Sequence, residues 1–226
     1  MCTVVVRWAQ GSPVLLLALR DELTGRPFDD PGTWWPDRPA LVGGRDRQAG
    51  GSWCVTDTAS GTSALVLNRR QRTVAAPMAP SRGVLPLLAA EPLQDWPRHL
   101  DLDGMASFAL VLAAPDRLTV WEFDGQRLTS ADLPAGTSMV TAGPADEDKI
   151  ARHLPVFQSA GTAAQWQAVV AGSTATDEPT SLLVHVERDD LTYATVIAQV
   201  IEAQPGRVQV RYSRTPAADW TERSWP

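Results

Sequence analysis

The residue with the most chemistry to offer is Cys2, which directly follows the initiator methionine. Removal of Met1 would place a thiol and a free α-amine on the same residue. A thiol must lose its proton to act as a nucleophile, and an α-amine with a pKa of about 7.7–8.0 can accept that proton near neutral pH. The sequence therefore presents a candidate nucleophile whose base is its own amine.

The same cysteine also opens an apolar run, residues 2–6, that is typical of a buried strand. Cysteine is among the most buried residue types, so Cys2 could equally fill a core beside the valines that follow it. Its position in the sequence does not separate the two interpretations, so both stay open at this point.

Length, charge and cysteine usage limit the classes of protein. With 226 residues and 44% hydrophobic content, the chain is predicted to be a single domain over residues 1–226. A net charge of −6 and a pI near 5.0 argue against a nucleic-acid binder. The two cysteines, Cys2 and Cys54, are too few for a fold that depends on several disulfides. The apolar run at 14–19 is too short for a signal peptide or a membrane span. We therefore expect a cytoplasmic protein without an integral membrane segment.

The elements that would position Cys2 are predicted to be mostly strands. Paired strands are expected at 2–8 with 14–19, 52–56 with 63–67, and 108–114 with 118–123, and further strands at 181–186, 194–201 and 208–212. Helices are expected at 84–90 with Ser81 as cap, from 146 toward 157, and at 162–171. The stretch 24–51 is rich in proline and glycine and is expected to be a long loop. Strands at both ends with helices between them predict an α+β domain built on antiparallel sheets.

Several short motifs follow one another in a characteristic order. They are Met1-Cys2, Leu19-Arg20-Asp21-Glu22, Arg26-Pro27, Trp34 or Trp35, Gly43-Gly44-Arg45-Asp46, Ala49-Gly50-Gly51-Ser52-Trp53, Leu67-Asn68-Arg69 and Ser81-Arg82-Gly83. This series resembles the NRDE family, also called the transport and Golgi organisation 2 (TANGO2) family, densely over residues 1–88 and more weakly beyond, as at Tyr193-Ala194-Thr195. The resemblance implies a fold similar to N-terminal nucleophile hydrolases, an αββα sandwich of two antiparallel sheets between helical layers.

Four residues are expected to carry catalysis if the resemblance extends to function: Cys2, Arg20, Asp21 and Asn68. Arg20 ends the predicted second strand, where its cation could lower the pKa of the thiol or hold a substrate carboxylate or carbonyl; alternatively it forms a strand-end ion pair with Asp21 or Glu22. Asp21 is similar to a carboxylate that orients the N-terminal amine in related hydrolases. Asn68 could donate its amide to a developing oxyanion, or simply form a turn.

Four further residues are expected to bind substrate: Trp34, Trp35, Trp53 and Arg69. The Trp34-Trp35 pair could form an aromatic lid over an apolar ligand, or pack a long loop onto the body of the protein. Arg69, with Arg70 and Arg72, makes a basic patch that could meet a phosphate or carboxylate, or a solvated turn. The three histidines show no metal-ligand spacing, so we expect neither a metal nor another cofactor.

Three polar positions of the family pattern differ in this chain. Leu19 replaces an asparagine, residues 140–144 lack a later asparagine motif, and Val196 replaces an arginine. Two classes of function therefore stay open. In one, the protein cleaves or transfers an acyl group of a small amide, lactam or thioester through Cys2. In the other, it is a non-catalytic binding or trafficking module for a lipid, haem or another apolar ligand.

Overall fold

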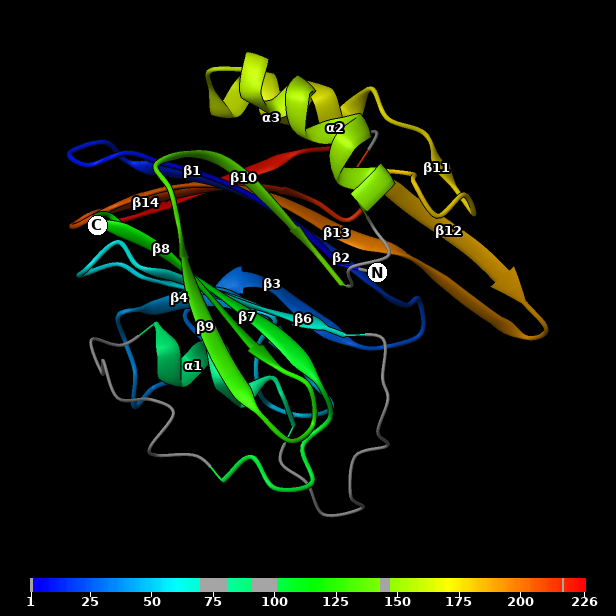
Figure 1. Cartoon of the computed structure of the whole chain (residues 1–226), viewed down its shortest axis with the longest axis horizontal. Coiled ribbons are helices and arrows are strands. Elements are labelled where there is room, and N and C mark those ends of the chain that lie inside the picture. Colours follow the sequence, from blue (N-terminus) through cyan, green and yellow to red (C-terminus); the bar gives the residue numbers. More distant parts are fainter. Residues whose placement is uncertain (1, 70–80, 91–100, 143–146, 217) are drawn as a thin grey trace.

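The computed structural model describes residues 2–69, 81–90, 101–142, 147–216 and 218–226. Within these residues the chain is mostly β, with two antiparallel sheets and three helices. Figure 1 shows the sheets stacked face to face, with α2 and α3 beyond one sheet and α1 beyond the other. The predicted strand-rich architecture with two antiparallel sheets is thereby confirmed.

The larger sheet contains the strands from both ends of the chain. Its order is β10-β1-β2-β13-β12-β11, and β14 and then β15 continue from β13. The pairings are antiparallel apart from the short parallel contact of β11 with β12. The bounds are β1 (Thr3–Trp8), β2 (Val14–Leu23), β10 (Gly136–Thr141), β11 (Ala175–Thr176), β12 (Leu183–Arg188), β13 (Leu191–Gln204), β14 (Arg207–Ser213) and β15 (Thr221–Trp225). The strand that follows Cys2 therefore lies inside this sheet, between β10 and β2.

The smaller sheet follows the order of the sequence from β3 to β9. Its strands are β3 (Phe28–Gly32), β4 (Leu41–Asp46), β5 (Cys54–Asp57), β6 (Ser63–Asn68), β7 (Phe108–Ala114), β8 (Arg117–Phe123) and β9 (Leu128–Leu133). The expectation of a long loop over 24–51 was wrong, because β3 and β4 lie inside it. Pro31 is tolerated because β3 is an edge strand and its pairing with β4 is interrupted between Asp29 and Gly32.

Two glycines of β4 are required by close packing rather than by a turn. A Cβ atom on Gly43 would lie 2.3 Å from the carbonyl oxygen of Cys54, and one on Gly44 would lie 2.2 Å from the ring of Trp53. The glycine pair therefore lets β5 and the Trp53 ring approach the β4 backbone, which explains how a glycine-rich segment belongs to a sheet interior.

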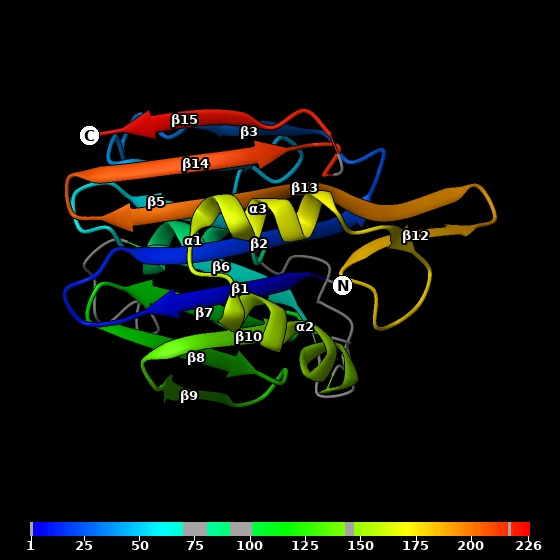
Figure 2. The same cartoon turned by 90° about the horizontal axis from the view of Figure 1, so that it is seen from above.

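The helices cover the outer faces of the sheets. α2 (Glu147–Ser159) and α3 (Ala163–Ala171) lie over the larger sheet, as Figure 2 shows, and α1 (Val84–Ala89) contacts β5, β6 and β7. α3 begins with a capping box between Thr162 and Gln165, which lies at the predicted start of this helix. Ser81 does not cap α1: the N-cap is Gly83, and the Ser81 hydroxyl accepts a hydrogen bond from the backbone of Gly83.

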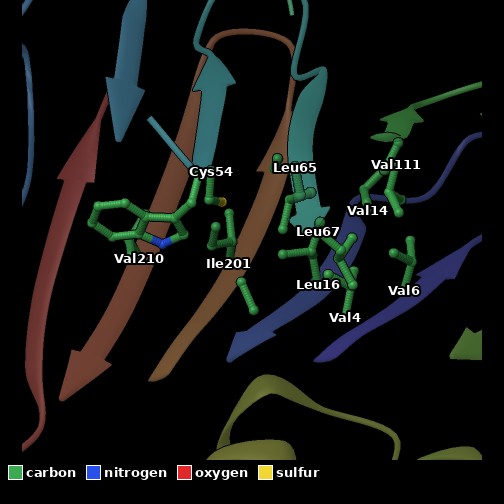
Figure 3. Packing of buried hydrophobic residues seen from close by; sticks show 14 of the residues in the cluster. Val4, Val6, Val14, Leu16, Cys54, Leu65, Leu67, Val111, Ile201 and Val210 are labelled. Atoms are coloured by element: carbon green, nitrogen blue, oxygen red, sulfur yellow. The ribbon is translucent and has the colours of Figure 1, made fainter. Parts of the chain in front are cut away.

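Alternation along β1 and β2 separates two cores. Val4, Val6, Leu16 and Ala18 face the smaller sheet and pack in the inter-sheet core with residues such as Leu67, as Figure 3 shows for the labelled members. The intervening residues pack beneath the helices with side chains of α2 and α3. Because side chains alternate along a strand, the pattern predicts that Cys2 and Arg20 face the space between the sheets, whereas Asp21 faces the helices.

Candidate functional site

A small cavity of about 130 Å³ lies where the N-terminal end of β1 meets the end of β2. The β1–β2 register pairs Thr3 with Leu19, so the next position places Cys2 opposite Arg20. The cavity is lined by Cys2, Arg20, Asp21, Glu22, Arg26, Asp46, Ser52, Trp53, Val66, Asn68, Ser81, Arg82 and Gly83. All four expected catalytic residues and Trp53 thus border a single cavity.

Cys2 is partly buried in this cavity, where its thiol donates a weak hydrogen bond to the carbonyl oxygen of Asp21, with 3.7 Å between the sulfur and oxygen atoms. Burial raises the pKa of the Cys2 thiol, the charge of Asp21 raises it further, and the charge of Arg20 opposes the shift. The thiol is therefore protonated at neutral pH. A nucleophilic role requires a base beside it, and Met1, whose removal would free that base, lies outside the described residues.

The raised pKa of Cys2 predicts a distinctive pH dependence of alkylation. Because the thiolate is the reactive form, labelling of folded protein at pH 7 should be slower than labelling of the urea-unfolded chain. The rate should still be rising above the ordinary cysteine pKa of about 8.5. Iodoacetamide labelling with peptide mapping measures both rates, and Cys54 is an internal control because burial raises its thiol pKa to about 12. A plateau in the Cys2 rate below pH 8 would contradict the prediction.

Arg20 is held rigidly on the inter-sheet side of the cavity. Its side chain is only 5% exposed, and its guanidinium carbon lies 4.1 Å from the ring centroid of Trp53 and 5.2 Å from that of Phe28. Its Nη2 donates to Asp46 over 3.0 Å and lies 3.7 Å from Glu22. These stacking and ionic contacts fix the cation beside Cys2.

Asp46 balances the cations beneath the cavity. Its Oδ2 accepts from Arg20 and, over 2.6 Å, from Nε of Arg26, while its Oδ1 accepts from the backbone amides of Gln48 and Ala49. Burial alone would raise the pKa of Asp46, but the hydrogen bonds from Arg26 and the backbone, with the nearby arginine charges, hold it below its ordinary value. Asp46 therefore stays ionised and occupied by these donors.

Asp21 is anchored by the neighbouring strand β13. Its Oδ1 accepts from the Thr195 hydroxyl over 2.6 Å, and its backbone carbonyl accepts from the Tyr193 hydroxyl over 2.9 Å. Burial raises the pKa of Asp21, and the charge of the fully buried Lys149 on α2 acts against that shift. A register irregularity between Thr195 and Ile197 accompanies this arrangement. Asp21 is thus a fixed carboxyl group next to the first residues of β1.

A close backbone contact brings Arg82 to the same cavity. A Cβ atom on Gly51 would lie 2.5 Å from the backbone of Gly83, and the Ser52 amide donates to the Gly83 carbonyl over 2.8 Å. Arg82 donates from Nη1 to the carbonyl of Ser107 over 2.9 Å. The two glycines therefore allow a distant segment to place a further cation near Cys2.

The other expected substrate-binding residues do not line this cavity. Trp34 donates to the carbonyl of Asp30 over 2.9 Å, and the buried Trp35 donates to that of Gly50 over 3.2 Å. Arg69 forms an ion pair with Glu122 and lines a separate cavity of about 740 Å³; Arg70 and Arg72 lie outside the described residues. A substrate contact of these tryptophans or of Arg69 stays a prediction.

Sequence reasoning missed four groups that complete the site: Arg26, Asp46, Arg82 and Thr195. Each belongs to a motif that carries the family resemblance, yet no role followed from the motif because its neighbours in the fold are distant in sequence. The sequence did offer one signal for Asp46 and Arg82: each is a charged residue close to a glycine within a motif, as in Gly44-Arg45-Asp46 and Arg82-Gly83.

Two absences hold for the part of the chain that the structure describes. No group of three or more histidine, cysteine, aspartate or glutamate side chains in it could hold a metal ion. None of its helices is long and apolar enough to cross a membrane.

Comparison with known proteins adds one finding to this geometry. No curated protein matches the chain. A model of the family described as Transport and Golgi organisation 2 (TANGO2) matches residues 1–204, which include all the residues around the Cys2 cavity. The match covers most of the 226 residues, and the chain belongs to the Transport and Golgi organisation 2 family.

Proposed function

We propose that the protein is an N-terminal cysteine hydrolase or acyltransferase that acts on an amide, lactam or thioester of a small metabolite. The observation that carries this proposal is the position of Cys2 in a cavity bordered by Arg20, Asp21 and Asn68. We also assign the fold to the αββα sandwich of N-terminal nucleophile hydrolases. The helices on the outer side of each sheet support that assignment.

The proposed reaction starts after Met1 has been removed. The α-amine of Cys2 takes the thiol proton as the sulfur attacks the substrate carbonyl, so that a carbon–sulfur bond forms. Collapse of the tetrahedral intermediate breaks the bond to the leaving amine or thiol, which receives the proton from the ammonium group. Water then attacks the thioester, passes a proton through the amine, and releases the acid with the thiol restored.

The surrounding residues have distinct proposed roles in this sequence. Asp21, fixed by Thr195, orients the α-amine that forms on removal of Met1. Asn68 ends β6 at the cavity and donates its amide to the oxyanion, an interaction worth about 3–4 kcal/mol in comparable sites. Arg20, held by Asp46 and Trp53, orients the acyl group.

The test is to trap the acyl-enzyme with a small activated ester, p-nitrophenyl acetate. Intact-mass analysis of the purified protein first establishes whether Met1 is absent. Peptide mapping after brief exposure should then find the acetyl group on Cys2 and not on Cys54. Complete retention of Met1 in a preparation that turns over the ester would refute the mechanism. The Cys2 nitrogen would then be a peptide nitrogen, which cannot accept the thiol proton.

A second candidate function is supported by the cavity of about 740 Å³. It lies between β8, β9, β10 and α2, its volume is in the range of small-molecule sites, and its lining includes Val120, Phe123, Leu133, Met139 and Ile150. This apolar surface favours the binding of a lipid, haem or similar ligand. In that case Cys2→Ala should leave the affinity for a fluorescent fatty acid or haem unchanged, whereas Ala131→Trp, which fills the cavity, should reduce it. An effect of Cys2→Ala alone would exclude this cavity as the binding site.

A further inference from the structure

Three arginines and three carboxylates border the Cys2 cavity, and the ion pairs among its described residues leave one arginine out. Arg20, Arg26 and Arg82 all line it. Asp46 is shared by Arg20 and Arg26, and the carboxylate of Glu22 lies 3.7 Å from Arg20 and 3.8 Å from Arg26. Asp21 also borders the cavity, but its carboxylate is held by Thr195 on the side of the sheet that faces the helices. The ion pairs found among the described residues of the cavity therefore involve Arg20 and Arg26 and not Arg82.

Arg20 has a buried donor that nothing in the described structure satisfies. Its Nη2 meets Asp46, but its Nη1 is buried and has no hydrogen-bond partner. A buried guanidinium N–H without an acceptor costs free energy, about 1–3 kcal/mol for a typical group and more for a charged one. The side chain is 5% exposed and is clamped by Trp53, so it cannot turn outward to find water. A ligand oxygen in the cavity would satisfy this donor.

Arg82 supplies a second cation with free donors. Its one hydrogen bond among the described residues goes to a neutral acceptor, the Ser107 carbonyl, and it makes no ion pair there. Arg82 and Cys2 border the same cavity; burial lowers the pKa of Arg82, and negative charge on Cys2 or on Glu22 acts against that shift. A partly buried arginine that lacks a carboxylate partner is typical of an anion site.

From this geometry we infer that Arg20 and Arg82 bind a permanent carboxylate of the substrate, next to the carbonyl that Cys2 attacks. The cavity of about 130 Å³ has room for about four water molecules at roughly 30 Å³ each, a size that suits a small acidic acyl group. The inference deepens the proposed function by naming its substrate class, small acyl compounds that carry a carboxylate near the scissile bond. Planar guanidinium groups match a carboxylate better than a neutral group of the same shape.

The test uses two alkylating reagents that differ in charge but little in size, iodoacetate and iodoacetamide. Both displace iodide with the Cys2 sulfur, so the ratio of their rates reports attraction for a carboxylate and needs no turnover. We expect the iodoacetate to iodoacetamide ratio at folded Cys2 to exceed that of the urea-unfolded chain by at least about tenfold. Arg82→Gln, which keeps a donor for the Ser107 carbonyl, should abolish most of this preference. Arg207→Gln, at an exposed position in β14 away from the cavity, is the matched control and should keep it.

Two outcomes overturn the inference: a folded ratio equal to that of the unfolded chain, or a ratio that Arg82→Gln leaves unchanged. If the buried thiol reacts too slowly with both reagents, melting temperatures with acetate and with acetamide replace the rates. Acetate should then raise the melting temperature of the wild type more than that of Arg82→Gln, and equal shifts overturn the inference. The proposed acyl transfer fails separately, through absence of ester turnover or of an acetyl group on Cys2, with the charge preference intact.

Discussion

Replacement of Cys2 by alanine is expected to reduce turnover of p-nitrophenyl acetate by about 10⁴-fold or more, since removal of a nucleophile abolishes the covalent route. The thiol makes only a weak contact with the Asp21 carbonyl, so the fold should survive the change. The melting temperature should therefore fall by only a few degrees. Steady-state kinetics and thermal unfolding on the same preparations measure both quantities.

Two further variants test whether turnover depends on the Cys2 thiol alone and whether it also needs the free α-amine. Cys54→Ala removes the other thiol, which is buried in the inter-sheet core, and should keep turnover within a few-fold of the wild type. A variant with an additional residue that cannot be removed in front of Cys2 keeps the thiol but converts its amine to a peptide nitrogen. It should lose turnover almost as completely as Cys2→Ala. Comparable activity in Cys2→Ala and the wild type would refute the N-terminal nucleophile.

Trp166→Ala is expected to lower the free energy of unfolding by about 3–5 kcal/mol, the range for large aromatic truncations in a core. Trp166 belongs to α3, and its side chain is completely buried in the core between the helices and the larger sheet. Its ring meets Phe157 edge-on at 5.4 Å, and its Nε1 donates to the carbonyls of Phe157 and Ala160. The residue thus joins α2 to α3 and both helices to the larger sheet.

Urea unfolding monitored by circular dichroism measures this loss. Val156→Ala is the matched control on the same helical layer, because Val156 is 45% exposed and its truncation should cost about 0.5 kcal/mol or less. Trp166→Phe separates volume from hydrogen bonding: it keeps most of the ring contacts but leaves the two carbonyls without their donor. Losses of similar size for Trp166→Ala and Val156→Ala would show that the helices are not anchored through this side chain.

The sequence predicts the adjacency of Cys2 and Arg20 because that adjacency is local. Two apolar runs separated by a turn-forming cluster must pair as a hairpin, and the short connection sets the register that places the two residues opposite each other. The hairpin of β7 with β8 and the capping box of α3 are predictable for the same reason. Each depends on residues only a few positions apart.

Strands without a clear alternation of apolar and polar residues were not predictable in this way. β9 is largely exposed and polar, and β3 and β4 owe their pairing to glycines and an interrupted ladder, so none of them alternates clearly between apolar and polar residues. The site shares this limit. Arg82 reaches Cys2 only through the contact of Gly51 with Gly83, and Asp21 is anchored by Thr195, 174 positions further along the chain.

The contact of Gly51 with Gly83 also makes the site vulnerable at positions that carry no charge. Both partners are backbone, so a methyl group added at Gly51 would meet atoms that no rotamer change can move aside. Such a methyl group would act as a wedge between two segments of the chain and shift Arg82 away from the thiol. A relative could thus keep every charged residue of the cavity and still lose its preference for acidic ligands. The distance between Arg82 and the Cys2 thiol depends on the absence of a side chain at both Gly51 and Gly83.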